Sequence, residues 1–226
     1  MTRQDLIDSF ADTLEISQRD LLGESARKAA NGTRGYEEDF RANVHGHFRA
    51  TQSGCPFRGL YLMSCTSLQA AELFYKNSGK ALWRIAVLNF SNPVEPGGGV
   101  TRGAVAQEDS LCRSSNLFPC LASRLALQRY YGPHQRGNAA LASDRVIYSS
   151  EVTVFKTGDP LPVLMSREEW FPIVFNTSSA PYYPEPPSMT EAALIELYIN
   201  NANNLYFSVL SESENHLNAV IPREQK

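Results

Sequence analysis

The sequence predicts an α/β fold in which helices and strands pack in layers around one core. The chain has 226 residues, enough for one sizeable domain. Short apolar runs typical of buried strands alternate, through the middle of the chain, with segments whose apolar residues recur at helical spacing. No internal repeat, low-complexity tract or change of composition divides the chain, so we expect residues 1–226 to form a single domain.

The first part of the chain is expected to be helical. Residues 2–16 place four apolar side chains at helical spacing, and Thr2 is a suitable N-cap. A second helix is expected at about 18–30, followed by a loop rich in charged residues, glycine and asparagine. We interpret residues 1 to about 58 as an N-terminal helical extension of the domain. The four apolar residues are Leu6, Ile7, Phe10 and Leu14.

The middle of the chain alternates between strands and helices. A short strand near 59–63 is followed by a helix from about Ser67 to Lys76. The run WRIAVLNF, residues 83–90, has the length and composition of a buried strand in a parallel sheet. Residues 104–117 are expected to form a helix that Pro119 interrupts.

The later elements follow the same alternation. A helix is expected from Leu121 to Tyr130. The segments RVIYSS and VTVFKT, residues 145–150 and 152–157, are rich in β-branched residues and predict two strands. WFPIVFNTSS predicts a further strand that ends in a Pro-rich loop, and residues 189–204 predict a helix that ends in an Asn-rich segment.

The composition is that of an ordinary soluble globular protein, with 42% hydrophobic and 20% charged residues. The net charge of -3 argues against a general nucleic-acid binder, which normally carries a basic excess. The acidic residues of the first segment do not fit a signal peptide, and the longest apolar run contains Arg84 and is too short to span a bilayer. We therefore expect no nucleic-acid or membrane partner and a cytoplasmic location.

Cysteine and histidine give little sign of a disulfide or a metal site. His45 and His47 form an HxH pair with no further ligands nearby in sequence, and a polar loop is the simpler interpretation. We expect reduced cysteines, no metal, no cofactor and a monomeric chain. The four cysteines form no CxxC pair and are Cys55, Cys65, Cys112 and Cys120.

The loop that follows the predicted strand 83–90 contains three consecutive glycines, Gly97 to Gly99. Glycine lets backbone N–H groups approach a ligand, and a helix that begins just beyond adds attraction for an anion. Such a loop lies at the carboxyl end of a strand, where α/β sheets bind ligands, and a diphosphate is the natural candidate. The pattern is neither a Walker loop nor GxGxxG, so it does not predict a usual ATP or NAD site. A purely structural turn is the alternative.

Polar residues on both sides of the glycines are compatible with a bound sugar. Asn89 and Asn92 precede the loop, and asparagine side chains can hold a sugar hydroxyl. Glu108 and Asp109 come at the start of the expected helix. Acids at this position either complement the helix N-terminus or donate a proton to a glycosidic leaving group. Residue type alone leaves both interpretations open.

The stretch NFSNPVEPGGGVTRGAVAQEDSLCRSSNLFPCL, residues 89–121, resembles the signature of microbial-type poly(ADP-ribose) glycohydrolases, a macrodomain family. That signature is GGG, a short spacer, QEE and a Ser/Arg-rich helix. SCTSLQAAELF, VIYSSEVTVFKT and NTSSAPYY resemble further segments of the family in the family's order. The resemblance spans roughly residues 60 to 183.

The resemblance implies a three-layer α/β/α macrodomain-like fold with a mixed sheet, whose partner is ADP-ribose or an ADP-ribosylated protein. It implies an ADP-ribosyl glycohydrolase that cleaves the ribose glycosidic bond of ADP-ribosylated proteins or poly(ADP-ribose) and releases ADP-ribose. Glu108 would help to orient the ribose, and Asp109 would protonate the leaving group and stabilise the oxocarbenium ion. The implied ligand-binding residues are Asn89, Asn92, Gly97, Gly98, Gly99, Val100, Gln107 and Phe155.

Two departures from the family pattern keep alternatives open. Asp109 replaces the second Glu, which sets the carboxyl about 1.3–1.5 Å further back, and a misplacement of about 1 Å can lower a rate by roughly 10²-fold. The family's later Gly-rich segment, of the LGAxGCGAF kind, is not found, which indicates a truncated or divergent C-terminal region. The alternatives are a hydrolase that uses Asp109 to remove single ADP-ribose units from arginine, and a reader that binds ADP-ribose without cleaving it.

Overall fold

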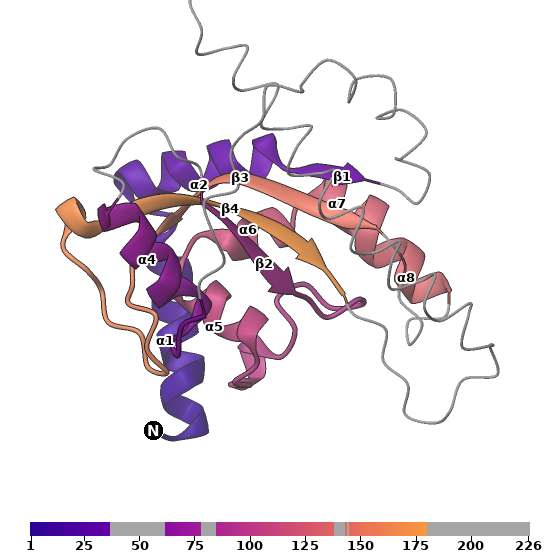
Figure 1. Cartoon of the computed structure of the whole chain (residues 1–226). Coiled ribbons are helices and arrows are strands. Elements are labelled where there is room, and N and C mark those ends of the chain that lie inside the picture. Colours follow the sequence, from indigo (N-terminus) through magenta and orange to yellow (C-terminus); the bar gives the residue numbers. More distant parts are fainter. Residues whose placement is uncertain (37–61, 78–84, 138–142, 144, 180–226) are drawn as a thin grey trace, which may run out of the picture.

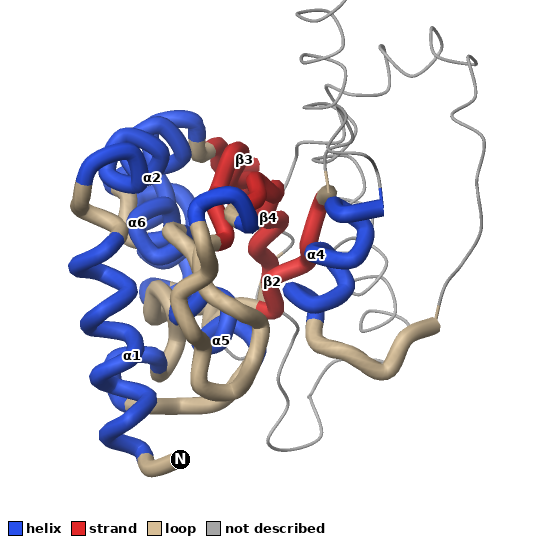
Figure 2. Tube along the Cα trace, turned by 90° about the vertical axis from the view of Figure 1, so that its left-hand side faces the viewer, coloured by secondary structure: helices blue, strands red, loops and turns tan. Residues whose placement is uncertain are grey.

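The computed structural model describes residues 1–36, 62–77, 85–137, 143 and 145–179, in which one mixed sheet lies between two layers of helices (Figure 1). Figure 2 shows α1, α2, α5 and α6 on one side of the sheet and α4 on the other, as the predicted three-layer fold requires. The α-helices are α1 (Arg3–Ile16), α2 (Asp20–Gly32), α4 (Ser67–Asn77), α5 (Gln107–Ser114), α6 (Leu117–Leu121), α7 (Arg124–Ala126) and α8 (Gly132–Arg136). The strands are β1 (Arg34–Tyr36), β2 (Ala86–Phe90), β3 (Val146–Val154) and β4 (Phe171–Ser178). The short turns are η1 (Val100–Arg102), η2 (Leu127–Tyr131) and η3 (Arg167–Glu169).

The described strands form one sheet in the order β1-β3-β4-β2. β3 is antiparallel to β1 and β4, whereas β2 is parallel to β4. In the β2–β4 pair, Asn89 lies opposite Thr177, and Phe90 lies opposite Ser178. The carboxyl ends of β2 and β4 therefore meet at one edge of the sheet, where the chain enters the glycine loop.

The two central strands are buried on both faces. Ile147 of β3 and Phe175 of β4 have no exposed surface and belong to one hydrophobic cluster with Ala29 of α2 and Leu121 of α6. Burial on both faces explains why β4 appears in the sequence as a near-continuous apolar run without a strict alternation.

The N-terminal helices are packed against the rest of the structure. Thr2 caps α1 by accepting a hydrogen bond from the backbone N–H of Asp5 at 3.2 Å, as its position predicted. Phe10 of α1 packs edge-to-face on Phe118, with ring centroids 5.1 Å apart. The buried ammonium of Lys156 reaches the Asp12 carboxylate of the same helix at 2.7 Å. The expected helical extension is thus part of the core over its described residues.

Two predicted strands form a single one. Residues 145–150 and 152–157 were expected as separate strands, but β3 runs from Val146 to Val154 with a register shift between Ser149 and Val152. Glu151 lies in this irregularity and has a φ of 57°. An irregularity of this kind bends a strand without ending it, and the local sequence does not distinguish it from a turn.

The prediction that Pro119 interrupts the helix of residues 104–117 is wrong. The helix ends earlier, because Ser115 is extended (φ -148°, ψ 173°) and forms a β-bridge with Val154. Pro119 instead lies in the first turn of α6. Backbone N–H groups in the first turn of a helix have no acceptor within the helix, so a proline there costs no hydrogen bond. The expected helix from Leu121 to Tyr130 is likewise replaced by α6 and by a second helical run that contains a π-helical turn.

The expected helix at Ser67 and the strand within residues 83–90 are confirmed as α4 and β2, but β2 is only partly buried, because Ala86 and Phe90 at its ends are exposed. The strand expected near 59–63 falls mostly outside the described residues. The C-terminal helix at 189–204 and the truncated or divergent C-terminal region lie entirely outside them.

Asn116 links three elements, so its removal is expected to destabilise the fold. Its Oδ1 accepts a hydrogen bond from the Thr153 backbone N–H at 2.8 Å, and its Nδ2 donates to Ser25 Oγ at 3.2 Å. Asn116→Ala should lower the free energy of unfolding by about 1–3 kcal/mol, because a backbone donor loses its acceptor. Urea unfolding of this variant and of the control Ser25→Ala, which leaves that donor paired, would test the prediction. Equal losses in the two variants would contradict it.

Candidate active site

The glycine loop is shaped by close approach to the acid pair. Gly97 and Gly98 have φ values of 69° and 58°, in the left-handed region that favours glycine. A Cβ on Gly98 would lie 3.0 Å from Oε2 of Glu108 and 3.5 Å from Oδ1 of Asp109. A side chain at position 98 would therefore enter the space in front of both carboxyl groups.

The turn before the glycines is held by Asn92. Its Oδ1 accepts hydrogen bonds from the backbone N–H groups of Val94 and Glu95, at 2.8 and 2.9 Å. Its own backbone N–H donates to Oε2 of Glu108 at 2.8 Å. The Asn92 side chain, which was expected to bind the ligand, thus has a structural function in this conformation.

Glu108 is a buried carboxyl group whose two oxygens both have partners. Only 2% of the residue is exposed. Besides the Asn92 contact, Oε1 accepts a weak hydrogen bond from Nδ2 of Asn89 at 3.5 Å. Burial raises the pKa of the Glu108 carboxyl to about 7, against the opposing effect of the Asn92 hydrogen bond. A carboxyl group in this state is able to exchange a proton near neutral pH.

Asp109 is equally buried but has one unpaired oxygen. Its Oδ2 accepts a hydrogen bond from the Ala106 backbone N–H at 2.8 Å, which closes the first turn of α5. Its Oδ1 has no hydrogen-bond partner within the described residues and faces Gly98. Burial raises the pKa of the Asp109 carboxyl, whereas the Ala106 contact and the Arg113 guanidinium oppose that effect. Oδ1 of Asp109 is therefore the one side-chain oxygen of the acid pair that has no partner within the described residues, and it is buried behind the glycine loop.

Asn89 extends the site to the sheet edge. It is fully buried, and its Nδ2 donates to Oγ1 of Thr177 at 3.2 Å, across the β2–β4 pair. Its Oδ1 has no hydrogen-bond partner. Thr177 was not expected at the site, although the quoted segment NTSSAPYY contains it. The register of two strands that are distant in sequence brings Thr177 there.

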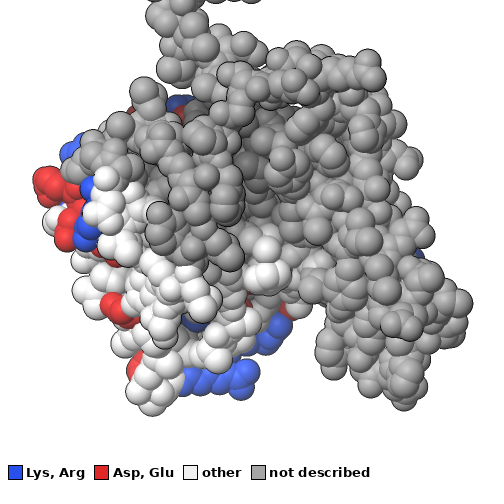
Figure 3. All heavy atoms as spheres, in the orientation of Figure 1, with Lys and Arg blue, Asp and Glu red and all other residues white. Residues whose placement is uncertain are grey.

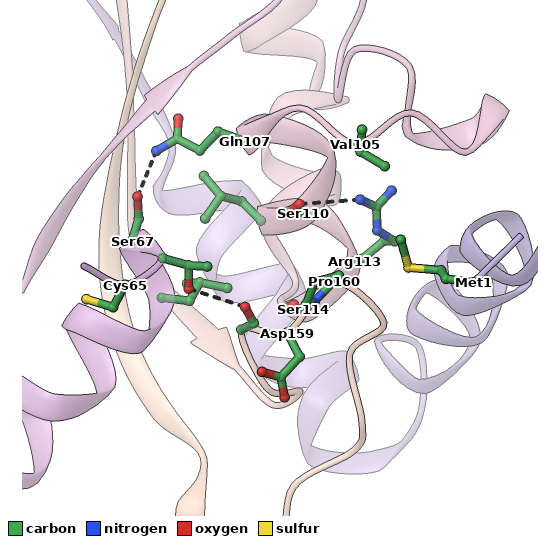
Figure 4. Close-up of a pocket in the computed structure, with 14 residues that line it drawn as sticks. Met1, Cys65, Ser67, Val105, Gln107, Ser110, Arg113, Ser114, Asp159 and Pro160 are labelled. Carbon is green, nitrogen blue, oxygen red and sulfur yellow. Dashed lines mark hydrogen bonds between the residues drawn. The ribbon is translucent and has the colours of Figure 1, made fainter. Parts of the chain in front are cut away.

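Gln107 connects the start of α5 to neighbouring elements. Its Oε1 accepts a hydrogen bond from the Phe90 backbone N–H, and its Nε2 donates to the Leu88 carbonyl, both at 2.9 Å. The same Nε2 donates to Oγ of Ser67 at the start of α4, also at 2.9 Å (Figure 4). The Gln107 amide was expected to bind the ligand, but it is engaged in positioning the helix that carries Glu108 and Asp109.

The two remaining residues expected at the site are buried. Val100 has no exposed surface and anchors η1 beneath the loop, where its backbone N–H donates to the Gly97 carbonyl. Phe155 is also fully buried and packs edge-to-face on Trp170, with ring centroids 6.3 Å apart. The described conformation therefore brings Phe155 into the core and offers no surface of its ring to a ligand.

Within the described residues, no group of three or more His, Cys, Asp or Glu side chains could hold a metal ion. His45 and His47 fall outside them. No helix in this part of the chain has the length and apolar character needed to cross a membrane. On the described part of the face in Figure 3, charged side chains of both signs occur in small groups among uncharged ones.

These features define an α/β protein with an acid pair behind a glycine loop at the carboxyl edge of its sheet. Residues 5–157 match the family model described as the microbial-type PARG catalytic domain. The match covers more than half of the chain, so the chain belongs to the microbial-type PARG family. A search among curated proteins gives no match.

Solved structures agree with this assignment. The chain is 27% identical to poly(ADP-ribose) glycohydrolase from Thermomonospora curvata, solved with the inhibitor ADP-HPD, with a TM-score of 0.72. That match covers 94% of this chain and 76% of the other. A structure of poly(ADP-ribose) glycohydrolase from Deinococcus radiodurans in complex with ADP-ribose matches in fold, with 23% identity, a TM-score of 0.65 and coverage of 84% and 71%. The chain is accordingly a glycosidase of the class that acts on ADP-ribosyl linkages.

The raised pKa of Glu108 predicts that stability falls as the pH rises. The Glu108 carboxyl of the folded protein keeps its proton up to a pH of about 7, whereas the same group in the unfolded chain releases it near pH 4.5. The contribution of this proton to stability is therefore complete below pH 4.5 and is lost as the pH rises from 4.5 to about 7. Between pH 5 and pH 8, the free energy of unfolding should fall by about 2–3 kcal/mol relative to Glu108→Gln. Urea unfolding of both proteins at each pH would measure this difference. Parallel pH dependences would contradict the prediction.

Proposed function

We propose that the chain hydrolyses the ribose glycosidic bond of poly(ADP-ribose) or ADP-ribosylated proteins with Asp109 as the proton donor and Glu108 as the residue that orients the ribose. The observation that supports these roles is the difference between the two acids. Both oxygens of Glu108 accept hydrogen bonds, whereas Oδ1 of Asp109 is buried, unpaired and directed toward Gly98. Burial raises the pKa of both carboxyl groups, which favours the protonated form that a general acid needs.

The ligand would lie against the loop, with the diphosphate and the scissile ribose near Gly97, Gly98 and Gly99. The start of α5 lies beside this loop and adds the positive end of a helix dipole. Asn89 would reach the ribose through its unpaired Oδ1. Val100 and Gln107 would support the site without direct side-chain contact, because Val100 is buried and both ends of the Gln107 amide are engaged within the protein, and Asn92 would support it through its Oδ1, which holds the turn before the glycines.

The reaction follows from this arrangement. As the bond between the anomeric carbon and the leaving oxygen breaks, Asp109 transfers its proton to that oxygen. The carboxylate that remains stabilises the oxocarbenium-like ribose. Water then attacks the anomeric carbon and returns a proton to Asp109, which releases ADP-ribose and restores the acid.

Removal of the acid should separate turnover from binding. Asp109→Ala is expected to lower kcat by at least about 10²-fold, because proton donation is lost, while the Kd for ADP-ribose stays within a few-fold. Asp109→Glu is the matched control, since it keeps the carboxyl group and has the side chain of the family pattern. Full activity of Asp109→Ala would exclude the assigned role.

The same assay should use arginine-linked, serine-linked, glutamate-linked and polymeric ADP-ribose. Release from the arginine linkage alone would favour the mono-ADP-ribosyl-arginine hydrolase, which the shorter Asp109 side chain suggests. Calorimetric binding of ADP-ribose without release from any linkage would indicate a reader.

The glycine at position 98 should be required for both binding and turnover. Gly98→Glu would place a charged side chain in a left-handed backbone position, with its Cβ 3.0 Å from Glu108 Oε2. We expect ADP-ribose binding to weaken by at least about 10²-fold, with turnover lost in parallel. Gly137→Glu introduces the same side chain at an exposed glycine with a φ of -100° and serves as the control. Near-normal affinity of Gly98→Glu would show that the ligand does not approach the loop.

A further inference from the structure

A second cleft lies on the opposite side of α5 from the acid pair. Its volume is about 520 Å³, within the range of roughly 300–1,000 Å³ that is common for small-molecule sites. Four lining residues of α5 lie at helical spacing on one face: Gln107, Ser110, Leu111 and Ser114. Glu108 and Asp109 do not line the cleft, whereas Gln107, which positions α5, does. Figure 4 shows the lining residues.

Arg113 places a buried positive charge at this cleft. The residue is 1% exposed, and it forms no ion pair within 4.0 Å in the described part of the chain, so the neighbouring Asp109 carboxyl acts on it only from a longer distance. Its Nη1 donates to the Ala104 carbonyl at 2.7 Å, and its Nη2 donates weakly to Ser110 Oγ at 3.4 Å. Among the described residues, its Nε has no hydrogen-bond partner. A buried guanidinium with an unpaired N–H is costly unless an anion or another acceptor is supplied.

The other walls favour an apolar body next to this charge. Leu68, Leu111, Val105 and Pro160 contribute apolar side chains. The one carboxylate in the lining, Asp159, is exposed, and Gln69 donates to it at 3.3 Å. In Figure 4 the Arg113 guanidinium points toward Ser110 and away from Asp159, so an anion at Arg113 would not meet that carboxylate.

We propose that the cleft behind α5 binds a small organic carboxylate with a short branched or linear apolar chain. The carboxylate accepts the free N–H of Arg113, and the apolar chain covers Leu68 and Leu111. Charge-assisted pairing with a guanidinium fixes the orientation of the ligand, and the apolar wall selects against a bare inorganic anion. The site does not depend on the catalytic roles proposed for Glu108 and Asp109.

Cys65 provides a reporter at this cleft. It is exposed and lines the cleft, whereas Cys112 and Cys120 are fully buried. The experiment uses the full-length protein with Cys55→Ser, in which Cys65 is alkylated by iodoacetamide. 4-Methylpentanoate at ten times its Kd should slow this alkylation about tenfold, because only protein without bound ligand reacts. The isosteric amide, 4-methylpentanamide, should not protect. Equal protection by the amide, or no protection by either compound, would overturn the proposal.

Two further measurements separate this site from the active site. Saturating ADP-ribose should leave the protection of Cys65 unchanged, and displacement of 4-methylpentanoate by ADP-ribose would refute a separate site.

Val105→Trp, which fills the cleft, should weaken calorimetric binding of 4-methylpentanoate by at least about tenfold, whereas Val163→Trp, at an exposed valine outside the cleft, should not. Both variants should bind ADP-ribose with unchanged affinity, so failure of this proposal is distinguishable from failure of the proposed function. Equal binding of 4-methylpentanoate by the two variants would contradict the proposal.

Discussion

The constraint on which this structure depends is the burial of two adjacent carboxyl groups behind a loop that has no side chains. Glu108 and Asp109 are each at most 2% exposed, and an uncompensated charge at either position would be expensive. The fold meets this cost with backbone N–H groups, from Asn92 to Glu108 and from Ala106 to Asp109. The Ala106 donor belongs to the local turn that opens α5, and the Asn92 donor comes from the segment just before the glycine loop, where Gly97 and Gly98 have left-handed backbone.

The rest of the fold holds that arrangement in place. The parallel pairing of β2 with β4 brings Asn89 and Thr177 together at the sheet edge. Gln107 then attaches the first residue of α5 to the end of β2 and to the start of α4. Because both ends of its amide are used, the position of the acid pair is set by the sheet and by the two helix layers together. Precise placement of this kind is what a glycosidase needs for proton transfer to a leaving group.

Strong local patterns predicted much of the fold, while contacts between distant segments determined the rest. The helices at Arg3 and Ser67 and the strand that ends at Phe90 follow directly from apolar periodicity. Residues 145–150 and 152–157 were expected as two strands, because the pairing with β4 that continues β3 past the irregularity at Glu151 is not visible in the local sequence. At the site, the order of the glycines and acids predicted their proximity. It could not show that the Gln107 amide binds backbone groups or that Phe155 packs on Trp170, since both depend on tertiary packing.

The central claim is that Asp109 supplies the proton for departure of the leaving group, and a substrate that needs no such proton tests it most directly. Single-turnover rates of wild type and Asp109→Asn would be compared on poly(ADP-ribose) and on 4-nitrophenyl ADP-ribose, whose nitrophenolate leaves unprotonated. The account predicts a loss of at least about 10²-fold on the polymer and a loss at least about tenfold smaller on the nitrophenyl substrate, where only the stabilisation of the oxocarbenium-like ribose is lost. Equal losses on both substrates would contradict it, because Asp109 would then act only on the ribose and would not protonate the leaving group.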